Sequence, residues 1–243
     1  MSAVAIILGR GGSKGLPRKN LLPIAGRPCV QWTIEAALAS REVEGVALSS
    51  DDPEMLALAR GLGAIAIERP PALASDAARV DDAARHAVAM LDSMGPPLAG
   101  AGNFVLLYAN VPVRPLDCID RAVRTLEATG CDSVQSYQGV GKHHPWWTAR
   151  VAADGTISPW EGDVLNHGVF RRQDLPPAFI PDGAVIALSR FALLLEIPDV
   201  PGGPHAFFGF DRRGIINPEG SVVDIDSRMD MLVAEAMLAP GKA

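Results

Sequence analysis

Short, almost uninterrupted apolar segments recur along the chain, each followed by polar residues. Such segments are typical of strands buried on both faces of a sheet, and they lie at residues 3–8, 45–51, 64–67, 103–108 and 132–137. Between and after them, apolar residues repeat with the period of a helix in segments 28–40, 53–61, 78–92, 116–129 and 228–238. Strands and helices alternating at this spacing predict an α/β fold with a mainly parallel sheet and right-handed crossovers.

Residues 138–182 depart from this alternation. The segment is rich in proline and contains Trp146, Trp147 and Trp160. Tryptophans in such a segment favour a pocket wall or an interface over an ordinary loop. We therefore expect either a long excursion over the active site or an extension that packs against a second subunit.

The first predicted strand is followed by a loop rich in glycine and cations, residues 9–20. It lacks both the Gly-Lys-Ser/Thr of a P-loop and the third glycine of a dinucleotide fingerprint. Glycines allow backbone N–H groups to approach phosphate oxygens, and the cations of the loop are Arg10, Lys14, Arg18 and Lys19. The pattern predicts a polyphosphate site, with a solvated surface turn as the alternative.

A pair of aspartates, Asp224 and Asp226, precedes the last predicted helix. If residues 221–227 form a strand, both carboxylates share one face while Ile225 faces the core. Two hard oxygen ligands suit Mg²⁺. Part of the same pattern is expected at any strand-to-helix junction, because Ser227 can cap the helix.

The composition narrows the class of protein. With 48% apolar and 21% charged residues among 243, the chain is typical of one sizeable globular domain. A net charge of −6 argues against a nucleic-acid partner, and no apolar run is long enough for a membrane span. Three widely spaced cysteines indicate neither a zinc site nor a disulfide framework, so we expect a cytoplasmic protein.

The first loop resembles the signature of the acylneuraminate (CMP-sialic acid synthetase-like) cytidylyltransferases, which activate eight- and nine-carbon 2-keto sugar acids. That signature is Ala-Arg-Gly-Gly-Ser-Lys-Gly-Ile/Leu-Pro-x-Lys-Asn, and only Gly9 departs from it. The resemblance extends to about Leu238. It implies a single domain, residues 1–243, with a Rossmann-like nucleotidyltransferase fold similar to the nucleotide-diphospho-sugar transferases, and a dimerisation excursion at about 138–182.

The resemblance also implies roles for the residues of this loop. Arg10 and Lys19 would contact the phosphates of CTP and act in catalysis. The other residues implied to bind the nucleotide are Gly11, Gly12, Ser13 and Asn20.

A second stretch, residues 68–76, resembles the family's Arg-Pro-x-x-Leu-Ala-x-Asp segment at the cytosine pocket. It implies that Arg69 and the backbone near Ala78 lie close to the base. As an alternative, Arg69 is a surface arginine. Ser75 and Asp76 can equally be caps of the following helix.

The acceptor side departs from the family pattern. Tyr108, Trp147 and Ile186 stand where the family commonly has glutamine, lysine and tyrosine. Tyr108 therefore occupies an acceptor-pocket position, and an unusual acceptor is expected. Arg114 matches a family arginine and is either a phosphate ligand or a cap of the following turn.

Further acceptor-side residues are implied by the segments that follow. Arg172 lies in a segment that matches the family's Arg-Arg/Pro-Arg-Gln-x-Leu-Pro and would face the carboxylate of the acceptor. Alternatively, Arg172 flanks an extended segment and its side chain lies in solvent. Phe207 and Phe208 would form an apolar wall of the acceptor pocket or belong to the core.

Together with these features, the resemblance implies transfer of CMP from CTP to the anomeric hydroxyl of a 2-keto sugar acid, with release of pyrophosphate. Mg²⁺ would bind Asp224 and Asp226, and either Asp226 or a metal-bound water would accept the proton. The expected partners are CTP, a small acidic acceptor and a second copy in a homodimer. The alternatives are another keto-sugar acid or a small phosphonate as acceptor, a glycosyltransferase, and a non-catalytic nucleotide-binding protein.

Overall fold

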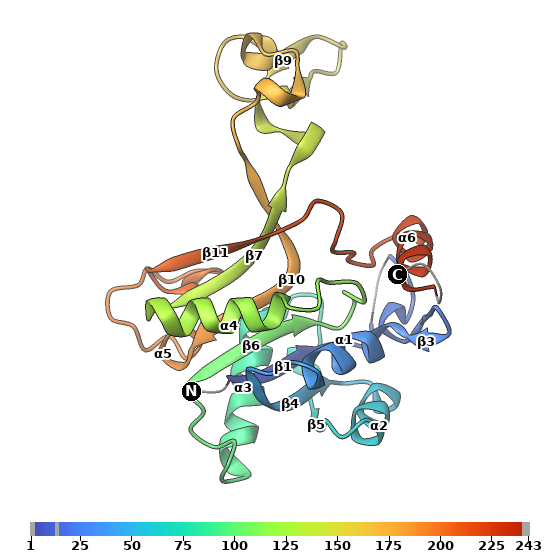
Figure 1. Ribbon diagram of the computed structural model, residues 1–243, viewed down its shortest axis with the longest axis vertical. Helices are drawn as coiled ribbons and strands as arrows, with labels where there is room; N and C mark the ends of the chain where they lie inside the picture. Colours follow the sequence, from blue (N-terminus) through green and yellow to red (C-terminus); the bar gives the residue numbers. More distant parts are fainter. Residues whose placement is uncertain (1–2, 13–14, 240–243) are drawn as a thin grey trace.

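A computed structural model describes residues 3–12 and 15–239 and contains a seven-stranded sheet (Figure 1). In spatial order the strands are β11 (Arg212–Asn217), β7 (Ser133–Gly139), β10 (Phe179–Ser189), β6 (Asn103–Tyr108), β1 (Ala3–Leu8), β4 (Val43–Ser50) and β5 (Ile65–Glu68). Only β10 runs antiparallel to its neighbours. The predicted α/β fold with a mainly parallel sheet is confirmed.

Helices cover both faces of the sheet. α1 (Cys29–Leu38), α2 (Pro53–Gly61) and α4 (Cys118–Thr129) pack on one face, and α3 (Val80–Ser93) and the short α5 (Arg190–Leu193) pack on the other. Successive residues of β1 enter the two cores in turn, so every residue of this strand is buried. This explains the unbroken apolar run at residues 3–8.

The carboxyl ends of β1, β4, β5 and β6 lie at one edge of the sheet, because these strands are parallel. The loop of residues 9–20 follows β1 at this edge. A short hairpin of β2 (Pro23–Ile24) and β3 (Arg27–Pro28) leads from the loop to α1. In parallel sheets ligands bind at this edge, so the fold positions the predicted phosphate loop where a nucleotide is expected.

The prediction of a strand at residues 221–227 is wrong. Val223 forms only an isolated bridge with Val113, and the Ile225 N–H donates to the Asn110 carbonyl (2.8 Å). The seventh strand of the sheet is instead β11, which the apolar pattern did not reveal because its first residues are polar and its edge position leaves them exposed. α6 (Arg228–Leu238) follows, with Ser227 as its N-cap.

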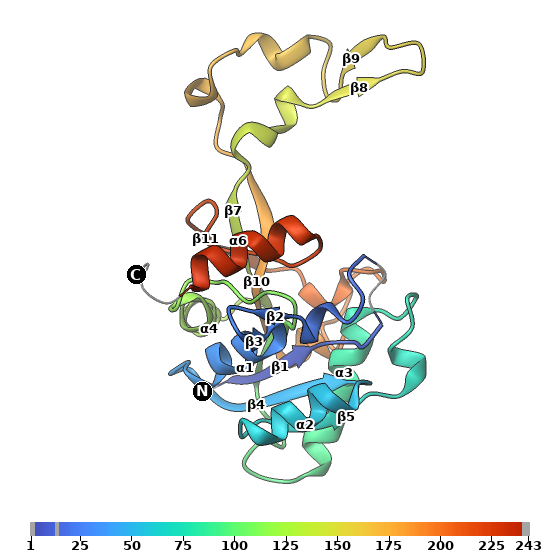
Figure 2. The ribbon, with the colours of Figure 1, turned by 90° about the vertical axis from the view of Figure 1, so that its right-hand side faces the viewer.

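Residues 138–182 form an arm that projects from the body (Figures 1 and 2). Strands β7 and β10 continue beyond the sheet as an antiparallel pair, with Gly139 opposite Phe179. The tip carries a second pair, β8 (Ala149–Val151) and β9 (Ile157–Pro159). The arm begins at the carboxyl end of β7 and extends outward from the body, and none of residues 138–180 lines either of the two cavities at this edge. The expectation of an excursion over the active site of the same chain is therefore wrong.

Candidate active site

Two cavities adjoin each other at the carboxyl edge of the sheet. The first, of about 420 Å³, is lined by the loop after β1, the segment after β5, the end of β6 and Asp226. The second, of about 600 Å³, lies over β7, β10 and the turn before β11. Both volumes are typical of small-molecule sites. The residues shared by the two walls are Ala78, Arg79, Val80 and Tyr108.

The loop after β1 is held by contacts on both sides. The Asn20 side-chain amide donates to the Arg10 carbonyl (2.9 Å), and the Gly11 N–H donates to the Asp51 carboxylate (2.9 Å). A Cβ at Gly9 would lie 2.8 Å from the Cβ of Ala109, closer than carbon atoms pack. The glycine that departs from the family signature is therefore required by the close approach of β1 to the loop after β6.

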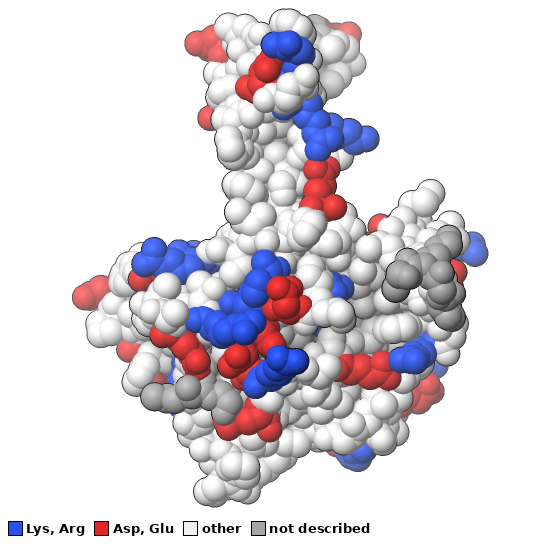
Figure 3. Space-filling model, viewed as in Figure 1, with Lys and Arg blue, Asp and Glu red and all other residues white. Residues whose placement is uncertain are grey.

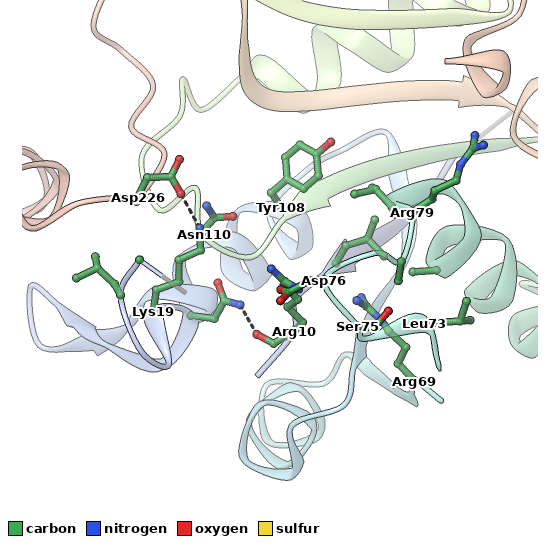
Figure 4. Close-up of a pocket in the computed structure, with 17 residues that line it drawn as sticks. Arg10, Lys19, Arg69, Leu73, Ser75, Asp76, Arg79, Tyr108, Asn110 and Asp226 are labelled. Atoms are coloured by element: carbon green, nitrogen blue, oxygen red, sulfur yellow. Dashed lines mark hydrogen bonds and ion pairs between the residues drawn. The ribbon is translucent and has the colours of Figure 1, made fainter. Parts of the chain in front are cut away.

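Both predicted phosphate-binding cations line the first cavity, and each is paired with a carboxylate. Arg10 Nη1 lies 2.6 Å from Asp76 Oδ1, and Lys19 Nζ lies 2.7 Å from Asp226 Oδ1. In Figure 4, Lys19 and Asp226 lie on one side of the cavity and Arg69 and Ser75 on the other. A bound triphosphate would have to replace these carboxylates as the ion-pair partners of Arg10 and Lys19.

Asp224 and Asp226 lie close enough to repel each other. Burial, and then the charge of Asp226, raise the pKa of Asp224 to about 6, while Lys19 and Asn110 oppose this shift. The Asn110 side-chain amide donates to the Asp224 carboxylate. Asp226 lines the first cavity, whereas Asp224 does not line it and contacts Asn110, which does.

This oxygen-rich donor set fits a hard cation such as Mg²⁺. Over residues 3–12 and 15–239, no cluster of three or more acidic, histidine or cysteine side chains could hold a metal ion. Any further ligands would have to come from the nucleotide and water, as is usual for Mg²⁺ at phosphates.

Arg69 is only 7% exposed, so the surface-arginine alternative is wrong. It lines the first cavity and donates to the carbonyl and hydroxyl of Ser49 (2.7 and 3.1 Å) at the end of β4. Burial lowers the pKa of Arg69. Ala78 also lines this cavity, close in sequence to Ser75 and Asp76.

Ser75 and Asp76 are not the caps of α3, because the helix begins at Val80 and Arg79 occupies the N-cap position without a side-chain bond. The Ser75 hydroxyl instead donates to the Ala72 carbonyl (3.3 Å). The segment after β5 therefore forms a cavity wall.

The second cavity contains the apolar wall expected on the acceptor side. Phe207 and Phe208 line it, with ring centres 4.3 Å apart, and both also pack in the core with Ile186. Tyr108 contributes to both cavities, and burial raises the pKa of its hydroxyl.

Several predicted residues lie elsewhere. Arg172 is on the arm, where its Nη2 lies 2.6 Å from Glu219 Oε2, and it lines neither cavity. Arg114 also lines neither; it donates to the Val111 carbonyl (2.7 Å), and burial lowers its pKa to about 10. Its hydrogen bonds go to Val111, which precedes it, and to Thr33 of α1, so neither the phosphate alternative nor a cap of the following turn is borne out.

Gly11 and Gly12 belong to the loop after β1 but do not line the first cavity. Ser13 and Lys14 lie outside the described residues. Arg18 forms an ion pair with Glu54 (2.8 Å) and faces away from the cavity lining.

Sequence reasoning missed Asn110, Arg79 and Arg212. Asn110 follows the carboxyl end of β6, which was a sufficient signal for a site position. The two arginines carried no comparable signal, because their neighbourhood depends on how α3 and β11 pack.

These features define an α/β protein with a nucleotide-sized cavity at the carboxyl edge of its sheet. The family model for cytidylyltransferases matches residues 4–144, more than half of the chain. The chain therefore belongs to the cytidylyltransferase family. None of the described helices is long and apolar enough to cross a membrane.

Curated relatives extend the match. The N-acylneuraminate cytidylyltransferase of Streptococcus agalactiae is 30% identical over 234 residues, or 96% of this chain and 52% of the relative. The chain thus spans about half the length of this relative. The 3-deoxy-manno-octulosonate cytidylyltransferase of Synechococcus elongatus is 45% identical over 83 residues, 34% of each chain.

Two solved structures share the fold. The CMP:2-keto-3-deoxy-manno-octonic acid synthetase complexed with CTP has a TM-score of 0.71 at 17% identity, and the alignment covers 98% of both chains. The 4-diphosphocytidyl-2C-methyl-D-erythritol synthase of Anaerococcus prevotii has a TM-score of 0.62 at 9% identity over 98% of both chains. These similarities support the predicted nucleotidyltransferase fold.

Proposed function

We propose that the protein transfers CMP from CTP to the anomeric hydroxyl of a 2-keto sugar acid and releases pyrophosphate. The observation that carries this proposal is the pair of adjoining cavities, one with Arg10, Lys19 and Asp226 and the other with an apolar wall and Arg212. Membership of the cytidylyltransferase family and the relatives named for sialic and octulosonic acids support it.

In this mechanism the first cavity holds CTP. Arg10 and Lys19 leave Asp76 and Asp226 and bind the phosphates, and the base lies toward Arg69 and Ala78. Fixed cations that stabilise charge developing on the phosphates account for most of the rate in phosphoryl transfer.

The acceptor occupies the second cavity, and its hydroxyl reaches the α-phosphorus past Tyr108. A bond forms between the hydroxyl oxygen and the α-phosphorus, and the bond from the α-phosphorus to the bridging oxygen of pyrophosphate breaks. Asp226 lies in the first cavity and accepts the hydroxyl proton. Asp224 and Asp226 would hold Mg²⁺, which supplies charge neutralisation at the phosphates when bound.

The direct test is pyrophosphate release with Mg²⁺ and each of CTP, ATP, GTP and UTP. The acceptor panel contains N-acetylneuraminate, a legionaminate, 3-deoxy-manno-octulosonate and 2-aminoethylphosphonate. We expect pyrophosphate release only when the nucleotide is CTP, and only with one of the sugar acids as acceptor. If only the phosphonate supports release, the protein is still a cytidylyltransferase, but its acceptor is a phosphonate and not a sugar acid. Binding of CTP without release from any acceptor would contradict the proposal and favour a binding protein.

The arm supports a homodimer. Of residues 140–178, all of which the structure describes, only His144 is buried. On the face shown in Figure 3, the middle of the arm is uncharged, with charged side chains at its tip and along one side. Its exposed large apolar side chains, with those at its base, are Val151, Ile157, Trp160, Val164, Leu165, Phe170, Phe179 and Ile180. An apolar projection without a core of its own needs a covering surface, and a second copy provides one.

Replacing Phe170 with aspartate is expected to convert the dimer to monomer. Phe170 is 83% exposed on the arm, and a charge there would be desolvated in an interface. Light scattering coupled to gel filtration measures the mass. The matched control is Leu116→Asp, a fully exposed apolar residue on the body, which should leave the dimer intact. A monomeric unmodified protein, or equal effects of both variants, would contradict this prediction.

A further inference from the structure

The second cavity is lined by three arginines, two of which are neutralised within the protein. Arg79 donates to both oxygens of Asp81 from Nε and Nη2 (3.0 and 2.9 Å). Arg213 is paired in the same way with Asp211 (2.9 and 3.0 Å). The charges of these two arginines are therefore compensated.

Arg212 is held differently. Its Nε donates to the Gly209 carbonyl (2.8 Å) and its Nη2 to the His205 carbonyl (3.2 Å), and its guanidinium carbon lies 5.5 Å from the centre of the Phe208 ring. Within the part of the chain that the structure describes, no carboxylate lies in ion-pairing distance of it. Neutral carbonyls orient a guanidinium without cancelling its charge, so Arg212 brings an uncompensated positive charge to the cavity wall.

The turn that supplies these carbonyls is itself fixed. Asp132 Oδ2 accepts from two backbone N–H groups of the turn (2.8 and 2.9 Å), and the Ser133 hydroxyl donates to the Phe208 carbonyl (2.7 Å). Gly209 has a φ of +69°, and a Cβ there would lie 2.4 Å from the Cβ of Asp132. The arginine is thus preorganised by the start of β7, which lowers the entropy cost of binding a ligand.

The opposite wall supplies neutral polar groups. Gln135 and Tyr137 project from the same face of β7, and the Tyr137 hydroxyl donates to Gln135 Oε1 (3.2 Å). Gly214 of β11 leaves room for this ring, because a Cβ there would lie 3.2 Å from Tyr137 Cδ2. The cavity therefore combines one uncompensated cation, Arg212, with the amide of Gln135, the hydroxyl of Tyr137 and the apolar wall of Phe207.

We propose that Arg212 binds the anionic group of the acceptor, and that the acceptor carries a two-oxygen anion of the carboxylate or phosphonate type. This inference rests on the proposed function. It assigns recognition of the anion to the turn before β11, independently of Arg172 on the arm. A planar guanidinium with one free edge suits such a group, since it offers parallel N–H donors to two oxygens.

The test compares Arg212→Gln with the matched control Arg213→Gln. Both arginines line the cavity and adjoin in sequence, but only Arg212 is uncompensated. With the panel acid that supports pyrophosphate release, Arg212→Gln should raise the KM for the acceptor about 10- to 100-fold. The KM for CTP and the melting temperature should stay within about 2-fold and about 2 °C of the unmodified values, given the exposure of the side chain. Arg213→Gln should change the acceptor KM less than about 3-fold.

A third measurement separates a contact with the anion from a general effect on the cavity. The unmodified protein should prefer the acid to its amide, and Arg212→Gln should lose this preference, whereas Arg212→Lys should keep part of it. A preference that survives Arg212→Gln, equal effects of the two glutamine variants, or a loss of CTP affinity would overturn the inference. Absence of release from every acceptor would instead overturn the proposed function, and this inference with it.

Discussion

Replacing Asp226 with asparagine is expected to lower the rate of CMP transfer at least about 100-fold while leaving the fold intact. Asp226 lines the first cavity, and its carboxylate contacts Lys19 (2.7 Å). The variant removes a carboxylate that both a metal ion and a proton transfer would use. Its side chain is 73% exposed, so the lost ion pair should cost at most about 1 kcal/mol of stability.

The matched control for this prediction is Asp76→Asn. Asp76 pairs with the other phosphate-binding cation, Arg10 (2.6 Å), but is not part of the aspartate pair. Pyrophosphate release and thermal melting should be measured on both variants. We expect less than about 10-fold loss for Asp76→Asn, because its ion pair with Arg10 is exposed to solvent. Equal losses would mean that both carboxylates only position cations, and full activity of Asp226→Asn would remove Asp226 from the mechanism.

Replacing Asn110 with aspartate is expected to lower turnover about 30-fold or more and to raise the Mg²⁺ concentration needed for half-maximal rate. The Asn110 side-chain amide donates to Asp224, and the Asn110 backbone carbonyl accepts from the Ile225 N–H (2.8 Å). An aspartate keeps the shape, but it loses the donor and adds a charge beside a carboxylate that is already repelled by Asp226. The Asp224 side chain would turn away from position 110, while the backbone bonds of Val223 and Ile225 would remain.

Asn110→Thr is the control, because the threonine hydroxyl can still donate a hydrogen bond and adds no charge. It should retain most of the activity. Binding of Mn²⁺ with CTP, followed by electron paramagnetic resonance, gives a readout that does not depend on turnover. Unchanged Mn²⁺ affinity in Asn110→Asp would contradict a positioning role for Asn110.

Local pattern alone predicted most of the body of the protein. The unbroken apolar run at residues 3–8 requires a strand buried on both faces, and the helical period of residues 53–61 requires a face against the sheet. Both follow from backbone hydrogen bonding, which fixes the side-chain period whatever the rest of the chain does. The residue types of the loop after β1 and of the aspartate pair also indicated a phosphate and metal chemistry without the fold.

What brings these parts together is decided by tertiary packing. Lys19 meets Asp226 across 207 positions of sequence, and Asp224 is held by one asparagine in place of a strand. The arm carries Arg172 away from the two cavities at the carboxyl edge, while Arg212, without a sequence signal, lines the second of them. Side-chain period is local, but edge strands, isolated bridges and shared cavity walls depend on contacts between distant segments. The sequence therefore determined the fold and the chemistry of the groups, and only the tertiary structure decided which groups face the same ligand.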